Sequence, residues 1–288
     1  MSDASEGKAP VIASVAAAWR FFSANWSLFV PGALFVGVAA GLGDLVQAMA
    51  TNAAGPSLGP VLMNGALNLV ASAVFVAAVL RKAVRDETTG LFGLTFGSDE
   101  VRLIGVSLSL AVMILPVFIL LALVFTVFVI QRIARTPEEL QALLADPDKF
   151  SQALQDSLGQ SGMLAMFLLI VLIAAIAVWA AVRLILINAA TIGERRIMIF
   201  QTWKWTHDNF FRVLAAWVLT ALPVIVAVFG SAILIGALTA GQQPTTAIEV
   251  FLIAAVAGFI SAMCQIPSLA LVAHLYRGFR PSDLPPAK

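Results

Sequence analysis

Three polar residues lie inside two of the long apolar stretches of this sequence, where their side chains could form a binding site. Asp44 lies six residues before the end of the stretch at 28–50, and Asn68 lies seven residues into the next stretch, at 61–80. At a helical rise of about 1.5 Å per residue, both lie roughly 10 Å from the same end of a helical hairpin. Asn64 shares a helix face with Asn68, one turn nearer that end. These residues predict either a polar pocket or, as we favour, an interhelical hydrogen bond worth about 0.6–2 kcal/mol.

A second candidate site consists of cations beside aromatic residues. Arg195, Arg196 and Lys204 lie in or next to the segment 197–206, in which apolar and aromatic residues recur at helical spacing. Next to a membrane-spanning stretch, such a helix lies in the headgroup plane, with its cations toward lipid phosphates. The segment therefore predicts either simple anchoring at the membrane surface or a site for an anionic lipid headgroup.

Arg183 lies near the end of another apolar stretch and is followed by four more apolar residues. A long cationic side chain in this position can extend to the headgroups while its stem stays in apolar surroundings. We expect Arg183 either to reach the headgroups in this way or to pair with Glu194 or a lipid phosphate.

The residues that carry most enzyme chemistry are scarce. The two histidines, His207 and His274, fall near the ends of apolar stretches, and the single cysteine, Cys264, lies inside one. No carboxylate pair or histidine cluster lies within these stretches, so the sequence predicts no metal site and no cofactor. No glycine-rich phosphate loop follows a strand, and no base accompanies the serines of the apolar stretches. We expect a protein that is not an enzyme and, with a net charge of +1, has no nucleic-acid partner.

The composition identifies the environment in which these residues act. Of the 288 residues, 60% are hydrophobic and only 11% are charged, whereas soluble domains carry about 25% charged residues. A spanning helix needs about 20 apolar residues, and six stretches meet this length. The sequence therefore predicts an all-α polytopic membrane protein with six transmembrane helices, at about 28–50, 61–80, 103–130, 163–187, 213–240 and 248–273.

The distribution of lysine and arginine predicts the orientation, because cytoplasmic loops carry an excess of both. With both termini in the cytoplasm, only Arg132, Arg135 and Lys149 fall on the outer side. The other 14 of the 17 basic residues fall on the cytoplasmic side: Lys8, Arg20, Arg81, Lys82, Arg85, Arg102, Arg183, Arg195, Arg196, Lys204, Arg212, Arg277, Arg280 and Lys288.

The chain also reads as three copies of one unit, each an amphipathic helix followed by a hairpin of two spans. Trp19-Arg20 stands six residues before Asn25-Trp26, and Trp203-Lys204 stands six residues before Asn209-Phe210. The first amphipathic segment is Val11–Ala24, and a weaker middle copy begins near Leu91. The alternative is that aromatic and basic residues gather at every membrane interface.

The remaining segments complete the predicted organisation. Residues 1–9 form a disordered N-terminal tail, residues 10–280 the six-span membrane domain, and residues 281–288 a C-terminal tail. The outer polar loop at 131–162 carries a helix start at Thr136-Pro137 and another at Asp148. We expect this loop to cover the outer face of the bundle.

Three segments carry a family resemblance: AWRFFSANWSLFVPGAL ending at Leu34, Glu194–Trp217, and LVAHLYRGF at Leu271–Phe279. They resemble a family of bacterial six-span inner-membrane proteins similar to the membrane domain attached to some glycerophosphoryl diester phosphodiesterases. The phosphodiesterase catalytic domain is absent, so the resemblance implies the architecture, the bacterial inner membrane and an association with lipid metabolism, but no catalytic residue.

Two functions fit these observations. The first is a non-enzymatic, lipid-associated or partner-binding membrane protein, whose partners would be anionic headgroups, another membrane protein or further copies of itself. The second is a small transporter or channel for a hydrophobic or lipid-like solute, favoured by the repeats and by Asp44.

Overall fold

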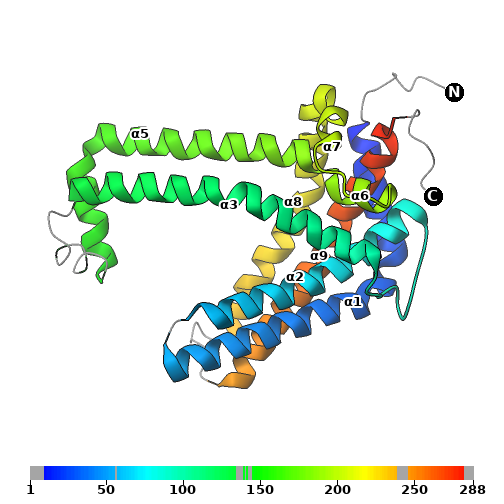
Figure 1. Ribbon diagram of the computed structural model, residues 1–288, viewed down its shortest axis with the longest axis horizontal. Helices are drawn as coiled ribbons and strands as arrows, with labels where there is room; N and C mark the ends of the chain where they lie inside the picture. The colour runs from blue at the N-terminus through cyan, green and yellow to red at the C-terminus, as the bar shows by residue number, and fades with distance from the viewer. Residues whose placement is uncertain are drawn as a thin grey trace. The chain divides into compact units, whose positions relative to one another are not determined.

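The computed structural model describes residues 10–55, 57–133, 139, 141, 145–238 and 246–281. Within these ranges the chain is helical, and its only extended pairing is an isolated bridge between Leu91 and Leu94. The predicted tail at 1–9, the predicted tail at 281–288 beyond its first residue, and the predicted helix start at 136–137 lie outside the described residues. The elements in chain order (Figure 1) are α1 Val11–Ala54, α2 Leu58–Leu80, the π-helix η1 Arg81–Arg85, α3 Ser98–Ile133, α5 Pro147–Leu184, α6 Ile187–Gly193, α7 Gln201–Trp205, the 3-10 helix η2 His207–Asn209, α8 Phe210–Leu238 and α9 Ala247–Phe279.

Six of these helices, α1, α2, α3, α5, α8 and α9, are long and apolar enough to cross a membrane. Each overlaps one of the six predicted stretches, and together they confirm the all-α polytopic fold. The helices α1 and α5 begin 17 and 16 residues before the stretches predicted at 28–50 and 163–187. Pro116, Pro223 and Pro267 lie inside α3, α8 and α9 without ending them. Such prolines are tolerated in spanning helices because neighbouring groups satisfy the freed backbone atoms.

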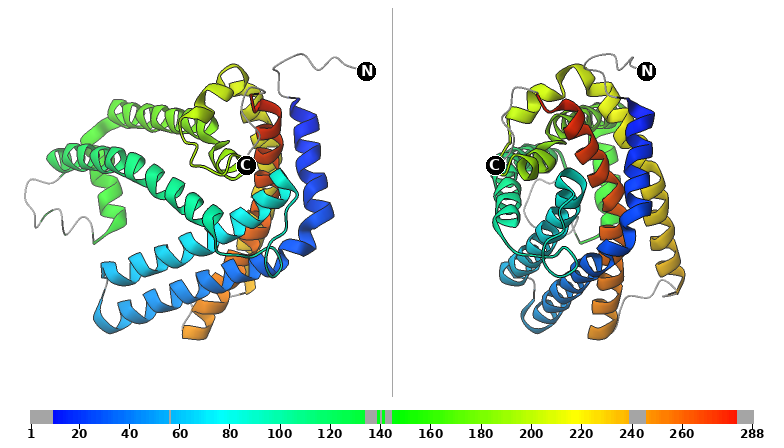
Figure 2. Two further views of the ribbon diagram at one scale, coloured as in Figure 1. Left: turned by 45° about the vertical axis from the view of Figure 1, so that its right-hand side comes forward. Right: turned by 90° about the vertical axis from the view of Figure 1, so that its right-hand side faces the viewer.

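The interfacial segments differ from the separate amphipathic helices expected of the three units. Val11–Ala24 is continuous with the first span in the single helix α1, which bends part-way along its length (Figure 2). No helix-breaking residue separates the two parts, and Pro31 lies inside the helix, where prolines commonly produce a bend. Of the segment 197–206, only the short α7 is helical, and the middle copy near Leu91 is a turn.

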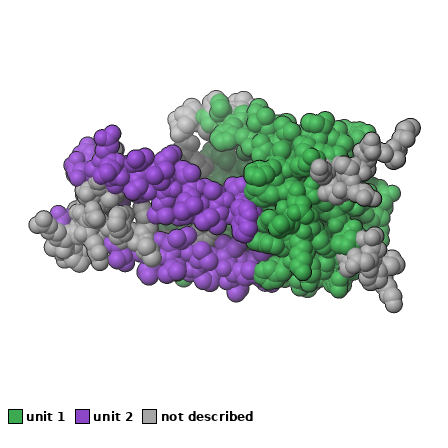
Figure 3. Space-filling model, turned by 90° about the horizontal axis from the view of Figure 1, so that it is seen from above, with its two compact units in different colours: residues 1–106, 182–288 green, residues 107–181 purple. Residues whose placement is uncertain are grey.

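The chain divides into two compact units, shown in Figure 3: residues 1–106 with 182–288, and residues 107–181. We call them unit 1 and unit 2. Unit 2 contains the later part of α3 and most of α5, and Gly159 breaks the regular geometry of α5 with φ of 61°. The predicted helix start at Asp148 is confirmed, because α5 begins at Pro147.

Unit 1 is built around α1, which packs most extensively against α9 and also against α2 and α8. Its close approach to α9 depends on glycine: a methyl group at Gly37 would lie 2.5 Å from the carbonyl oxygen of Ala255, and one at Gly41 would lie 2.7 Å from that of Phe251. Small residues at such positions allow spanning helices to pack backbone to backbone.

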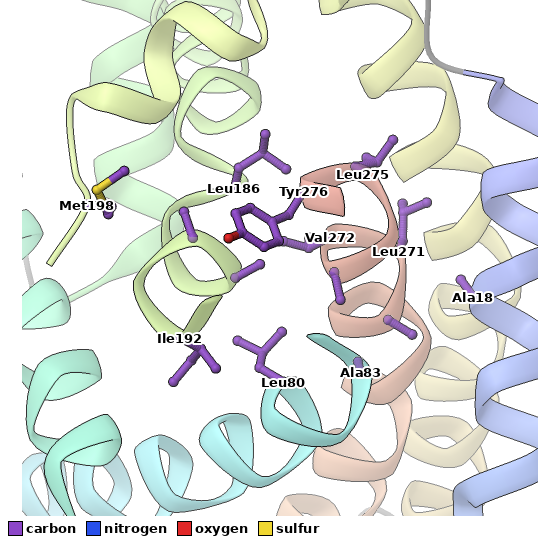
Figure 4. Close-up of a cluster of buried hydrophobic side chains, with 14 of the residues drawn as sticks. Ala18, Leu80, Ala83, Leu186, Ile192, Met198, Leu271, Val272, Leu275 and Tyr276 are labelled. Atoms are coloured by element: carbon purple, nitrogen blue, oxygen red, sulfur yellow. The ribbon is translucent and has the colours of Figure 1, made fainter. Parts of the chain in front are cut away.

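One end of unit 1 is held together by a single apolar core, and we call it the basic end. Buried side chains of α1, α2, η1, α3, α5, α6, α8 and α9 contribute to this core, as does Met198 of the segment 194–209. Its apolar core joins Leu80, Leu186, Ile192 and Leu271 to Tyr276 (Figure 4). The described cations at the basic end are Arg20, Arg81, Lys82, Arg85, Arg102, Arg183, Arg195, Arg196, Lys204, Arg212, Arg277 and Arg280.

Candidate functional site

The structure joins Asp44, Asn64 and Asn68 in one hydrogen-bond network between α1 and α2. The amide nitrogen of Asn64 donates to Asp44 Oδ1 and to Gln47 Oε1, each at 2.9 Å. Asn68 Nδ2 donates to Asn64 Oδ1 at 2.6 Å and to the Asn64 carbonyl at 3.0 Å. A hydrogen bond does link α1 to α2, but the partner of Asp44 is Asn64 and not Asn68, which the predicted depth favoured. Gln47 is a further member that the predicted site did not include.

This network is tightly packed. A methyl group at Gly43 would lie 2.1 Å from Asn64 Oδ1, so glycine lets α1 approach the amide. The neighbouring groove between α1 and α2 is lined by apolar residues alone, and includes none of the three polar ones. The arrangement fits a structural link between two spans better than a polar pocket.

Replacing Asn64 by leucine should lower the free energy of unfolding by about 0.6–2 kcal/mol, the usual worth of an interhelical hydrogen bond in a membrane. Thermal unfolding in mild detergent measures the change. Asn25→Leu is the control, because the Asn25 amide donates only within its own helix, to the Phe21 carbonyl. An equal loss of unfolding free energy in the two variants would show that the Asn64 hydrogen bonds do not stabilise the packing of α1 against α2.

At the basic end, the most buried ion pair joins Arg81 to Glu100. Arg81 Nη1 lies 2.5 Å from Glu100 Oε1, and the two side chains are 5% and 0% exposed. Arg81 Nη2 also donates to the Gly93 carbonyl at 3.1 Å, while Glu100 Oε2 accepts from the Gly97 amide at 2.8 Å. The pair therefore ties the end of α2 to the start of α3 and to the loop between them.

A second group of ion pairs neutralises three more cations. Asp99 accepts from Arg85, and also from Arg102 at 2.9 Å. Glu87 lies 3.1 Å from Arg85 Nε and 3.3 Å from Arg195 Nη2. Arg195, one of the predicted headgroup contacts, is thus held by a carboxylate of the chain.

Glu194 joins the segment after α6 to the end of α9. Its Oε1 accepts from the Tyr276 hydroxyl and from Arg280 Nε, each at 2.6 Å. Burial by itself would raise the pKa of Glu194, but the hydrogen bonds from Arg280 and Tyr276 and the charges of Arg280 and Arg196 lower it overall. Because this pKa is depressed in the folded protein, the contribution of Glu194 to stability is present at neutral pH and is lost as the pH falls through the lowered pKa.

Arg183 lies in the interior of unit 1. The residue is 7% exposed, and its guanidinium carbon lies 6.0 Å from the centre of the Phe210 ring. Its backbone carbonyl accepts from the Thr206 hydroxyl at 3.5 Å. This burial disagrees with the expectation that Arg183 reaches the headgroups, and the carboxylate of Glu194 forms an ion pair with Arg280.

Arg196 and Lys204 are brought together by the structure. Both side chains are exposed, and both line a pocket of about 420 Å³ at the basic end. Gln201 supplies an amide group, Trp205 an aromatic ring, and the remaining lining residues are Met198, Phe200 and Pro281. Among the described residues, neither Arg196 nor Lys204 forms an ion pair with a carboxylate. These two cations, unlike Arg195, therefore remain available to an external anion.

The sequence carries a signal for these ion pairs, although none of the acidic partners is among the predicted site residues. The basic segment Arg81–Arg85 ends one span, and Asp99-Glu100 begins the next after a short loop. Charges of opposite sign at the facing ends of neighbouring helices are placed to pair, and pairing is required when they are buried.

No group of three histidine, cysteine or acidic residues is placed to hold a metal ion in the described part of the chain. Comparison with known proteins gives no family: no protein-family model, no curated protein and no solved structure matches the chain. The resemblance to the phosphodiesterase membrane domain therefore remains a prediction.

Proposed function

We propose that the chain is a non-enzymatic protein of the bacterial inner membrane that binds an anionic lipid headgroup in the pocket of Arg196 and Lys204. The observation that carries this proposal is the contrast among the cations of the basic end. Arg81, Arg85 and Arg195 form ion pairs with carboxylates of the chain. Neither cation of the pocket forms such a pair among the described residues, and the charge of Arg196 acts on Glu194 only from beyond ion-pair distance.

The chemistry of the pocket fits a lipid phosphate. The guanidinium of Arg196 can donate two parallel hydrogen bonds to phosphate oxygens, and Lys204 adds a second positive charge. The Gln201 amide can donate to a headgroup oxygen, and Trp205 has the amphipathic ring that favours the membrane interface. Ile197 and Phe200 are 47% and 61% exposed, so a phosphate held in the pocket would lie beside exposed apolar side chains.

The proposal places the basic end and both termini in the cytoplasm, where anionic headgroups attract basic segments. The excess of lysine and arginine at this end supports that orientation. A phosphatase reporter, active only after export, should be inactive when fused after Lys288 and active when inserted after Gly55, between α1 and α2. Activity of the fusion after Lys288 would show that the C-terminus is exported, and this result would contradict the proposal.

The double variant R196Q/K204Q should weaken binding of phosphatidylglycerol about 30-fold, because each cation near a membrane surface contributes about 1 kcal/mol and 1.4 kcal/mol corresponds to tenfold in affinity. Binding is measured by titrating the purified protein in neutral detergent with phosphatidylglycerol, with phosphatidylcholine as the zwitterionic comparison.

The matched control is R20Q/R277Q, which removes the same charge from exposed positions at the basic end but outside the pocket. We expect this control to bind phosphatidylglycerol like the wild type. Equal weakening in both double variants would show that total charge, not the pocket, attracts the lipid.

A further inference from the structure

The loop 86–97, between η1 and α3, contains a turn whose apolar side chains are exposed. Leu94 donates its amide to the Leu91 carbonyl at 3.0 Å, and Gly90, Phe92 and Gly93 all have positive φ. A positive φ is unfavourable for a bulky residue such as Phe92, so the surrounding contacts must impose it. The turn nevertheless leaves Leu91 77% exposed and Phe92 56% exposed.

Contacts on the inner side fix the turn against the spans. The Gly93 carbonyl accepts from the buried Arg81, and a methyl group at Gly93 would lie 3.9 Å from the Ala78 side chain. A methyl group at Gly32 of α1 would meet the Leu94 side chain at 3.2 Å. Figure 2 shows the segment between η1 and α3 turning back beside α1.

These contacts determine how deep the turn lies. Ala78 is two residues before α2 ends at Leu80, and Gly32 is four residues into the apolar stretch that begins at Leu28. At about 1.5 Å per residue, the turn is therefore roughly 3–6 Å inside the ends of these apolar stretches. Leu34 and Phe35, just beyond Gly32 on α1, are exposed apolar residues, so the turn extends an apolar surface that already belongs to a spanning helix.

We propose that the turn 90–96 re-enters the membrane and that Leu91, Phe92 and Phe96 insert at the boundary between the headgroups and the acyl chains. Irregular backbone at this depth must have its polar groups satisfied by protein. Arg81 donates a hydrogen bond to the Gly93 carbonyl, and Glu100 neutralises the positive charge of Arg81. This inference concerns a surface separate from the pocket of Arg196 and Lys204.

The depth of the turn can be measured with spin labels, because Cys264 is the single cysteine of the chain. The variants L91C and F96C each carry one cysteine for labelling on a C264A background. Leu91 is 77% exposed and Phe96 is 62% exposed, so both labelled variants should fold. T88C is the matched control, since Thr88 is an exposed polar residue of the same loop. The labelled chains are placed in nanodiscs of phosphatidylethanolamine and phosphatidylglycerol, and oxygen and a water-soluble nickel chelate are compared as relaxing agents.

We expect oxygen to relax the labels at 91 and 96 more strongly than the nickel chelate, with the order reversed at 88. Two results would overturn the proposal. Labels at 91 and 96 that behave like the label at 88 would place the turn in water. Labels at 91 and 96 that are shielded from both agents would show that protein, such as a second copy of the chain, covers the turn instead of lipid.

Discussion

Replacing Glu100 by glutamine is expected to lower the free energy of unfolding by about 3 kcal/mol, because the buried charge of Arg81 then keeps only the more distant Asp99, whose Oδ2 lies 3.9 Å from Arg81 Nη1, as its counter-charge. Glu100 is fully buried, and Arg81 is held between it and the Gly93 carbonyl. The midpoint of thermal unfolding in mild detergent should fall accordingly, and less folded protein should reach the membrane.

Two further variants separate this effect from a general loss of charge. Glu87→Gln removes a carboxylate whose side chain is 39% exposed, and its ion pairs should contribute no more than about 1 kcal/mol. The double variant R81L/E100L removes both buried charges and should be less destabilised than Glu100→Gln alone. If Glu100→Gln were no worse than Glu87→Gln, the Arg81–Glu100 pair would not be the link that the structure shows.

The second large effect is expected where α1 crosses α9. Gly37→Ala should destabilise the folded chain by about 1–3 kcal/mol, because the added methyl group would overlap the Ala255 backbone carbonyl at 2.5 Å. The backbone atom cannot move without shifting α9, so Gly37→Leu should be more damaging still. The same thermal unfolding measurement applies to both variants.

Gly65→Ala is the matched control, because a methyl group at Gly65 in α2 meets nothing within 4 Å. Replacing glycine by alanine at such a helical position stabilises by roughly 0.5–1 kcal/mol in soluble helices. We therefore expect Gly65→Ala to unfold at or above the wild-type midpoint. A Gly37→Ala variant as stable as Gly65→Ala would contradict the close packing of α1 on α9.

The number and position of the spanning helices could be predicted from the sequence, because each depends on a local property. A bilayer requires about 20 consecutive apolar residues whatever the rest of the chain does. The end of α2 at Leu80 and the start of α9 at Ala247 lie within one residue of the prediction for that reason. A hydrogen bond between Asp44 and the asparagines of α2 was also predictable, because antiparallel neighbours fix their relative depth, but the partner is Asn64, one turn from the predicted Asn68.

The interfacial segments were harder to predict, because amphipathic spacing does not show where a helix ends. The periodicity of Val11–Ala24 is real, but it continues into α1 without a break. The segment 197–206 has the same spacing and forms only the single turn of α7. In both cases tertiary contacts, not periodicity, decide the outcome.

The headgroup site shows that sequence pattern also fails to predict the partners of individual side chains. Arg195 and Arg196 are adjacent arginines, yet Arg195 pairs with Glu87 and Arg196 lines the pocket. Arg195 has a φ of 52°, a left-handed conformation that turns the chain between the two side chains. A partner 108 residues away in the sequence decides which cation is neutralised, so the choice could not be made from local pattern alone.

The most direct measurement is native mass spectrometry of the chain extracted from bacterial membranes in mild detergent, with retained lipids identified by mass. The proposal predicts that the wild type and R20Q/R277Q retain phosphatidylglycerol or another anionic phospholipid, and that R196Q/K204Q loses it. A wild-type chain that retains only zwitterionic lipid, or an R196Q/K204Q chain that retains the same anionic lipid as the wild type, would contradict an anionic headgroup site at Arg196 and Lys204.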